Sequence, residues 1–215
     1  MAQIFSKKAN LWPLYLLVIV VALLVGTTGF FWYFGSPKYT DVGYRPTQPV
    51  DYSHKLHAGD LGIDCRYCHT SVEVSAKALV PPTETCMNCH SLVGLDNPKL
   101  EPVRASWESG KSIEWTRVHD LPDYVFFNHS AHLTAGVGCE SCHGNVAKEV
   151  KVMQEKDLSM GACLTCHRAP EMHLRRSDQV TLMGWTPPED QFEIAAKIIA
   201  DKKINPPTDC SGCHR

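Results

Sequence analysis

Hydrophobic residues are distributed unevenly along this chain of 215 residues. One unbroken apolar run extends from Leu11 to about Phe34 and contains no charged residue. A helix of this length crosses the roughly 30 Å hydrocarbon layer of a membrane. Aromatic residues, which favour the two headgroup layers, gather at both ends of the run: Trp12, Tyr15, Phe30, Phe31, Trp32, Tyr33 and Phe34. The pattern predicts a cytoplasmic N-terminus and an uncleaved transmembrane signal anchor over residues 1–34.

Beyond the anchor the hydrophobic pattern has little helical or strand periodicity, so regular secondary structure should be sparse. Residues 35–49 are rich in Gly, Pro, Thr and Tyr, which favours an extended connector. The clearest helix should begin near Thr186-Pro187-Pro188-Glu189, which reads as a capping box with Pro at the first helical position. We expect it to end at Lys202 and Lys203. Its predicted apolar face consists of Phe192, Ala195, Ala196, Ile198 and Ile199.

Two blocks of the chain repeat one pattern. V-D-Y-S-H-K-L-H begins at Val50 and V-F-F-N-H-S-A-H begins at Val125, and each block leads through a Gly-containing loop into C-x-x-C-H. A repeat of this kind indicates that one supersecondary unit was used twice. We therefore expect a dihaem module over residues 50–94, a linker over 95–124 and a trihaem module over 125–215.

The cysteines explain why these modules are expected to hold haem. All ten belong to five copies of C-x-x-C-H, at Cys65/Cys68/His69, Cys86/Cys89/His90, Cys139/Cys142/His143, Cys163/Cys166/His167 and Cys210/Cys213/His214. In c-type haem sites the two thiols bond to the porphyrin vinyl groups and the adjacent His ligates iron. Zinc sites and redox-active thiol pairs also use C-x-x-C, but every pair here is followed by His. The sequence predicts five haem c groups with these five histidines as proximal iron ligands.

The size of the chain limits how the haems can be arranged. The 181 residues after Phe34 leave about 36 for each haem, too few for a separate protein shell around each one. We predict a mostly irregular and α-helical multihaem cytochrome c, folded around stacked haems. Thioether attachment takes place outside the bacterial cytoplasm, so a single-pass protein of the inner membrane with a periplasmic haem domain is expected. The net charge of -2 offers no basic surface for nucleic acid.

The repeated histidines are the candidates for the distal iron ligands. His54 and His129 precede the motif of their own block, and we expect them to ligate the haems at Cys65/Cys68 and Cys139/Cys142. His57 and His132 lie three residues later and should ligate the haems at Cys86/Cys89 and Cys163/Cys166. An iron with both axial positions occupied carries electrons but does not readily bind substrate.

The aromatic-x-His-x-x-His pattern before C-x-x-C-H resembles the cytochrome c3 and c7 families. Those families place a further ligand just ahead of a later motif to serve the last haem. The corresponding residue here is Met160, so the resemblance implies a His/Met haem at Cys210/Cys213. Met153, His119 and His173 are the alternatives for this ligand.

Four further strings resemble the pentahaem subunits of alternative complex III, a quinol-oxidising respiratory assembly: Tyr52 to His57, Pro81 to His90, Glu114 to His119 and Phe127 to His132. The resemblance covers nearly the whole chain. It implies an iron–sulfur subunit and a multi-span membrane subunit as partners, with a monohaem cytochrome c or a terminal oxidase as electron acceptor. The chain itself would be an electron-transfer subunit rather than an enzyme, anchored in membrane lipid.

Three other kinds of protein share some of these features. The first is an anchored tetrahaem-type cytochrome that oxidises quinol directly, but Cys65 lies about thirty residues beyond Phe34. The second is a multihaem enzyme such as a nitrite reductase, which needs a five-coordinate iron, and here enough His and Met are present to fill all five sites. The third is a free periplasmic carrier of the cytochrome c3 type, which the retained anchor disfavours.

Overall fold

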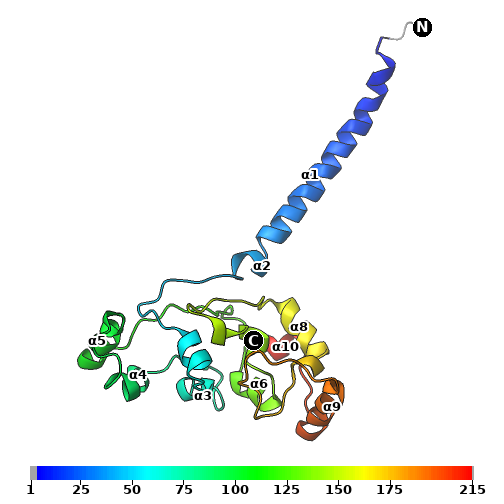
Figure 1. Ribbon diagram of the computed structural model, residues 1–215. Helices are drawn as coiled ribbons and strands as arrows, with labels where there is room; N and C mark the ends of the chain where they lie inside the picture. Colours follow the sequence, from blue (N-terminus) through cyan, green and yellow to red (C-terminus); the bar gives the residue numbers. More distant parts are fainter. Residues whose placement is uncertain (1–3, 215) are drawn as a thin grey trace. The chain divides into compact units, whose positions relative to one another are not determined.

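The computed structural model describes residues 4–214 and divides into two compact units, Met1–Val42 and Gly43–Arg215. The first unit holds a 3-10 turn, η1 (Lys7–Leu11), followed by α1 (Trp12–Phe34) and the single turn α2 (Pro37–Thr40) (Figure 1). Pro13 lies in the first turn of α1, where its missing N–H has no intrahelical partner to lose.

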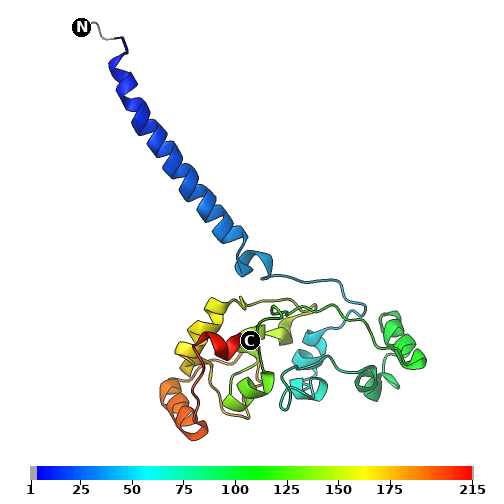
Figure 2. The ribbon, with the colours of Figure 1, turned by 180° about the vertical axis from the view of Figure 1, so that it is seen from behind.

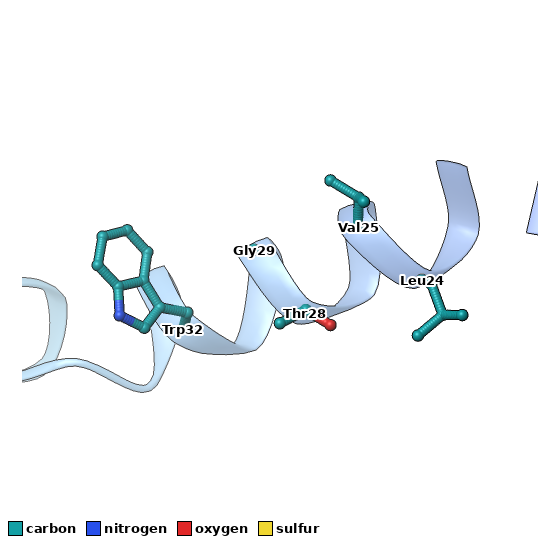
Figure 3. Close-up of a pocket in the computed structure, with 5 residues that line it drawn as sticks. All are labelled: Leu24, Val25, Thr28, Gly29 and Trp32. Carbon is teal, nitrogen blue, oxygen red and sulfur yellow. The ribbon is translucent and has the colours of Figure 1, made fainter. Parts of the chain in front are cut away.

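Helix α1 agrees with the predicted anchor to within one residue. Its segment is long and apolar enough to cross a membrane, and none of its residues is buried. Figure 3 shows the side of the helix where Gly29 leaves a shallow hollow, bordered by Leu24, Val25, Thr28 and Trp32. An apolar helix that is exposed on every face suits a lipid environment. Lipid, rather than the rest of the chain, would then cover its apolar side chains.

The second unit consists of short helices joined by long loops, as Figures 1 and 2 show. In both views α4 and α5 lie at one end of this unit and α8 and α9 at the other, with α3 and α6 between them. Its elements are η2 (Lys55–Asp60), α3 (Cys65–Cys68), α4 (Thr83–His90), η3 (Pro98–Leu100), α5 (Glu101–Ser109), α6 (His129–Ala135), α7 (Glu140–His143), η4 (Val146–Lys148), α8 (Met160–Arg168), η5 (Glu171–His173), α9 (Gln191–Lys202) and α10 (Cys210–Cys213). Residues 4–214 contain no β-strand, only the isolated antiparallel bridges Val125–His214 and Val137–Leu174.

Helix α9 corrects two details of the prediction. It begins at Gln191, after Asp190, so Thr186 is not its cap. Thr186 and Pro187 each precede a proline, which disfavours helical backbone and delays the start of the helix. Phe192, placed on the apolar face by its spacing, is 64% exposed, whereas Ala195 is fully buried where α9 packs against η5 and α6. The end of the helix is as predicted, with Lys202 in its last turn.

The hydrophobic core of the second unit is small. Among its described residues the buried hydrophobic side chains are Val50, Val103, Leu174, Val180 and Ala195. A domain of this size ordinarily buries many more such side chains. The scarcity agrees with the expectation that large apolar bodies other than side chains occupy the centre of this fold.

Candidate haem-binding sites

Each C-x-x-C pair lies within a helical turn or at its start. Three of these turns are capped by the side chain of a residue shortly before the first cysteine: Asp64, Ser159 and Asp209 accept hydrogen bonds from the backbone N–H groups of the first turn. Residues i and i+3 of a helical turn lie on the same face, so the two thiols of each pair point to one side. None of the ten cysteines is paired in a disulfide, so every thiol is available for thioether formation.

The backbone determines the tautomer of most of the candidate iron ligands. In seven histidines Nδ1 lies 2.6–3.3 Å from a backbone carbonyl oxygen, which can only accept a hydrogen bond. Nδ1 must therefore carry the proton, which leaves the Nε2 lone pair free to bind a metal. The seven, all predicted ligands, are His57, His69, His90, His129, His132, His167 and His214.

Three predicted pairs of proximal and distal histidines are brought together. The ring centroids are 6.2 Å apart for His57 and His90, 6.1 Å for His132 and His167, and 6.3 Å for His129 and His143. Metal–imidazole bonds are about 2 Å long, so two imidazoles on opposite faces of one metal have centroids about 6 Å apart. These separations fit an iron between the members of each pair.

The fourth predicted pair, His54 and His69, is less completely described by ring geometry. His69 is near enough to act electrostatically on His54, whose Nδ1 is buried without a hydrogen-bond partner. Burial, followed by His69 and His57, lowers the pKa of His54 to about 4. Burial likewise lowers the pKa of His143 to about 3, and burial is also the main cause that lowers the pKa of His132. These imidazoles are therefore neutral at physiological pH, which is the form that ligates iron.

An aromatic side chain packs against both histidines of each repeated block. The ring of Tyr52 lies 4.8 Å from that of His54 and 4.5 Å from that of His57. Phe127 lies 4.7 Å from His129 and 4.5 Å from His132. The ring holds both imidazoles of its block in fixed directions, because stacked and edge-on aromatic contacts restrict rotation.

Contacts among the thiols show which motifs are neighbours in space. Cys68 lies near Cys86 and Cys89 of the second motif, and hydrogen bonding between Cys65 and Cys139 links the first motif to the third. Burial, then the thiols of Cys166 and Cys163, raises the pKa of Cys142 to about 11, so the third motif adjoins the fourth. Burial and the nearby Cys213 raise the pKa of Cys163, which places the fourth motif beside the fifth. The spatial order is second, first, third, fourth, fifth.

The four candidates for the remaining ligand lie in different places. Met160 begins α8, is 61% exposed, and stands one turn before Cys163, which neighbours the fifth motif. The sulfur of Met153 accepts a hydrogen bond of 2.9 Å from Arg45. His119 packs edge-on against His143 at 4.4 Å, with its Nε2 buried and unpartnered. His173 ends η5, and its carbonyl accepts from the N–H of Gly138 beside the third motif.

The sequence pattern missed two features of these sites. The first is the set of backbone carbonyls that orient the ligands, because loops distant in sequence supply several of them, such as Ala76 for His129 and Pro207 for His167. The second is a buried ion pair between Arg175 and Glu140. Glu140 lies inside the third motif. The acidic residue within C-x-x-C was the only local signal for this pair.

No group of three or more His, Cys, Asp or Glu side chains within residues 4–214 is arranged to hold a metal ion by itself. Zinc sites of the structural kind require such convergence of four ligands. Each cysteine pair here instead has a histidine beside it, as attachment to a porphyrin requires. The donor set, the tautomers and the ring separations fit haem c.

Comparison with known proteins agrees with this chemistry. The family model described as cytochrome c7 and related cytochrome c matches residues 125–215. The chain is also 32% identical over 177 residues to the menaquinone reductase, multihaem cytochrome c subunit, of Nitratidesulfovibrio vulgaris, an alignment that covers 73% of this chain and 80% of that relative. The predicted fold class is confirmed. The chain is a multihaem c-type cytochrome with a cytochrome c7-like domain, and it belongs to the family of the multihaem cytochrome subunit of menaquinone reductase.

Proposed function

We propose that this chain is a membrane-anchored pentahaem cytochrome that relays electrons from a quinol-oxidising complex of the alternative complex III type to a periplasmic cytochrome c or a terminal oxidase. The observation that carries the proposal is the pairing of motif and repeat histidines at 6.1–6.3 Å. Imidazoles on both faces of an iron leave no position for substrate, so the residues serve a carrier rather than an enzyme. Bound haem supplies reversible one-electron chemistry.

The placement of the side chains supports the following ligand sets. The first four motif histidines pair with His54, His57, His132 and His129, in the combinations His69/His54, His90/His57, His167/His132 and His143/His129. Met160 completes the fifth site with His214. This choice is supported by its place on α8 beside the fifth motif, whereas the Met153 sulfur already accepts from Arg45 and His119 lies against His143.

Met160 can be tested separately from the rest. A thioether ligand favours ferrous iron and raises the reduction potential, so Met160→His should lower one midpoint of five. The matched control is Met153→His, which should leave all five midpoints in place. A titration in which Met160→His changes nothing removes Met160 from the ligand set.

The neighbouring thiols support one continuous path through the protein. The order second, first, third, fourth and fifth site puts the Cys65–Cys139 neighbourhood where the sites of the first predicted module meet those of the second. The second and fifth sites are then the two ends, where donor and acceptor would dock. The chain's part in the reaction is to hold the five sites close together and to exclude substrate from iron.

The complex is proposed on two grounds. The strings around the ligands resemble the pentahaem subunits of alternative complex III, and a relative at 32% identity is named as a subunit of a menaquinone reductase. The partners that follow are an iron–sulfur subunit, a multi-span membrane subunit and membrane lipid around α1. Anchoring by α1 in the inner membrane would place the haem domain in the periplasm.

The relative's name favours one alternative. A menaquinone reductase delivers electrons to quinone, so this chain would carry electrons from a periplasmic donor towards the membrane. Direct oxidation of quinol by this cytochrome, of the tetrahaem quinol dehydrogenase type, is the other alternative. The proposed function and these two alternatives differ in the partners of the chain and in the direction of electron flow.

The test is to extract the protein gently with detergent, identify its companions and count its haems by mass spectrometry. We expect five thioether-linked haems, only low-spin ferric iron by electron paramagnetic resonance, and reduction by menaquinol only when the companion subunits are present. Fewer than five haems, or rapid carbon monoxide binding by the ferrous protein, contradicts the proposal that the chain is a pentahaem electron carrier. Reduction by menaquinol of the isolated chain favours direct quinol oxidation, and rapid reduction of menaquinone by the reduced complex favours the reversed direction.

A further inference from the structure

The third attachment motif has a buried ion pair behind it. The side chains of Arg175 and Glu140 are 4% and 19% exposed, and Nη2 of Arg175 lies 3.5 Å from Oε2 of Glu140. In every other ion pair within residues 4–214 at least one partner is 42% exposed or more. Charges removed from water act over longer distances than surface charges, because the surrounding dielectric screens them less.

The guanidinium of Arg175 is held tightly beside the first cysteine of this motif. Nη1 donates to the carbonyl of Leu182 at 2.7 Å, and the group lies 4.4 Å over the ring of Trp185. A Cβ added to Gly138 would lie 2.3 Å from the guanidinium carbon, so the cation packs directly on the backbone that precedes Cys139. Hydrogen bonding with Cys65 is the largest cause that lowers the pKa of Cys139; burial opposes it, and a backbone hydrogen bond and then the charge of Arg175 lower the pKa further.

Glu140 is part of the motif itself, between Cys139 and Cys142. Its carboxylate accepts backbone hydrogen bonds from Gly184 at 3.0 Å and Trp185 at 3.2 Å, in addition to its contact with Arg175. The corresponding residue in the other four motifs is not acidic: Arg66, Met87, Leu164 and Ser211. The third site therefore has one cation and one anion fixed at its attachment turn, and both are less exposed than the Arg66–Asp64 pair at the first site.

We propose that Arg175 and Glu140 set the reduction potential of the haem held at Cys139 and Cys142, acting as positioning residues of opposite sign. The inference rests on the proposed function, which supplies the haem at this site. Arg175 favours the electron-rich ferrous state and raises the potential, while Glu140 opposes it. Because the third site joins the two modules, the balance of these two charges decides whether electrons cross easily from one module to the other.

The experiment is a redox titration of the full-length holoprotein with Glu140→Gln and Arg175→Gln, alone and together. Glu140→Gln keeps an acceptor for the turn at Gly184 but removes the negative charge. It should raise one midpoint potential by about 59 mV, which corresponds to a tenfold change in the equilibrium constant of a one-electron reduction. Arg175→Gln should lower the same midpoint, and the double variant should return close to the wild-type value.

Two controls identify the effect. Asp178→Asn removes a charge from the exposed Arg176–Asp178 pair, whose side chains are 67% and 65% exposed, and should leave all midpoints in place. Repeating Glu140→Gln in a His129→Met background identifies the affected haem, because the ligand exchange marks the midpoint of the third site.

The outcomes separate this inference from the proposed function. Five loaded haems with no shift in Glu140→Gln, or shifts of the same sign in both single variants, overturn the electrostatic role and leave the carrier intact. If one single variant does not assemble, the midpoint shift of the other variant is compared with that of the double variant. The sign of the difference then shows whether the missing charge acts as proposed. Fewer than five haems in the wild-type protein overturns the proposed function instead.

Discussion

The two repeated blocks, residues 50–57 and 125–132, have nearly the same internal geometry. In each, one aromatic ring lies 4.7–4.8 Å from the first histidine and 4.5 Å from the second. In each, Nδ1 of the second histidine donates to the carbonyl four residues earlier, Ser53 for His57 and Asn128 for His132. Contacts within one turn repeat wherever the local sequence repeats, since the backbone places residues i and i+4 together.

The blocks differ where their partners are distant in sequence. His129 donates through Nδ1 to Ala76, which belongs to the other predicted module, whereas Nδ1 of His54 is buried without a partner. The first block continues into the π-helical turn η2, and the second into the α-helix α6. η2 packs against η4, and Lys55 donates its N–H to the carbonyl of Glu149. The same local pattern is therefore completed by different tertiary contacts.

Exchanging the second histidine tests whether the two blocks have equivalent roles, and should have the largest effect. His57→Met and His132→Met should each raise one midpoint, on the order of 0.1–0.3 V, because a thioether ligand stabilises ferrous iron. Redox titration followed by optical spectroscopy measures the shift. Equal shifts in the two variants support equivalent ligands, and a high-spin signal in place of a shift would show that Met does not reach iron.

The close packing at Gly59, two residues beyond the first block, is the next difference between the two repeats. An added Cβ would lie 2.3 Å from the carbonyl oxygen of Ala147 in η4, so the close approach of η2 and η4 requires glycine. Gly59→Ala should lower the free energy of unfolding by about 1–3 kcal/mol through overpacking. Thr134 is the aligned residue of the second block, and Thr134→Ala is the matched control. Denaturant titration of both holoproteins measures the difference, and equal stability in the two variants would contradict the prediction.

The helix cap of the second block should have a smaller effect. The side chain of Asn128 accepts from the N–H groups of Ser130 and Ala131, whereas Ser53 accepts only from Leu56 at 3.2 Å. Asn128→Ala should cost about 1 kcal/mol of unfolding free energy, and Ser53→Ala less. Thermal unfolding of the two variants compares the caps. A larger loss in Ser53→Ala would contradict the prediction that the Asn128 cap of α6 contributes more than the Ser53 hydrogen bond at η2.

The residue before the first cysteine that follows each block is Asp64 in one case and Gly138 in the other. Because only Asp64 has a titratable side chain, we expect the two repeats to differ in the pH dependence of their stability. Hydrogen bonds from Arg66 hold the pKa of Asp64 at about 2, below the ordinary value of about 3.9. The lowered pKa stabilises the fold above about pH 4, and this contribution is lost as the pH falls towards 2. Because the side chain is 42% exposed, we expect only about 1 kcal/mol. Asp64→Asn should flatten the stability profile between pH 4 and 2, and an unchanged slope would exclude this carboxylate as its origin.

The sequence by itself predicted the long apolar helix near the N-terminus, the five C-x-x-C turns and which repeated histidines lie near which motif histidines. Each of these depends on residues within a few positions of one another: an apolar run, two thiols one turn apart, and histidines placed at i and i+3. It also predicted the end of α9, since Lys202 lies in its last turn. Its error at Thr186 has the same local character, because two successive prolines outweigh a capping pattern.

Only the tertiary structure decided the order of the sites and the surroundings of each ligand. Cys65 and Cys139 are 74 positions apart, and the carbonyl of Pro207 reaches His167 across 40. The Arg175–Glu140 pair likewise joins residues 35 positions apart. No periodicity encodes such contacts, because they arise where loops with few hydrophobic side chains fold around shared apolar bodies rather than around a core of their own.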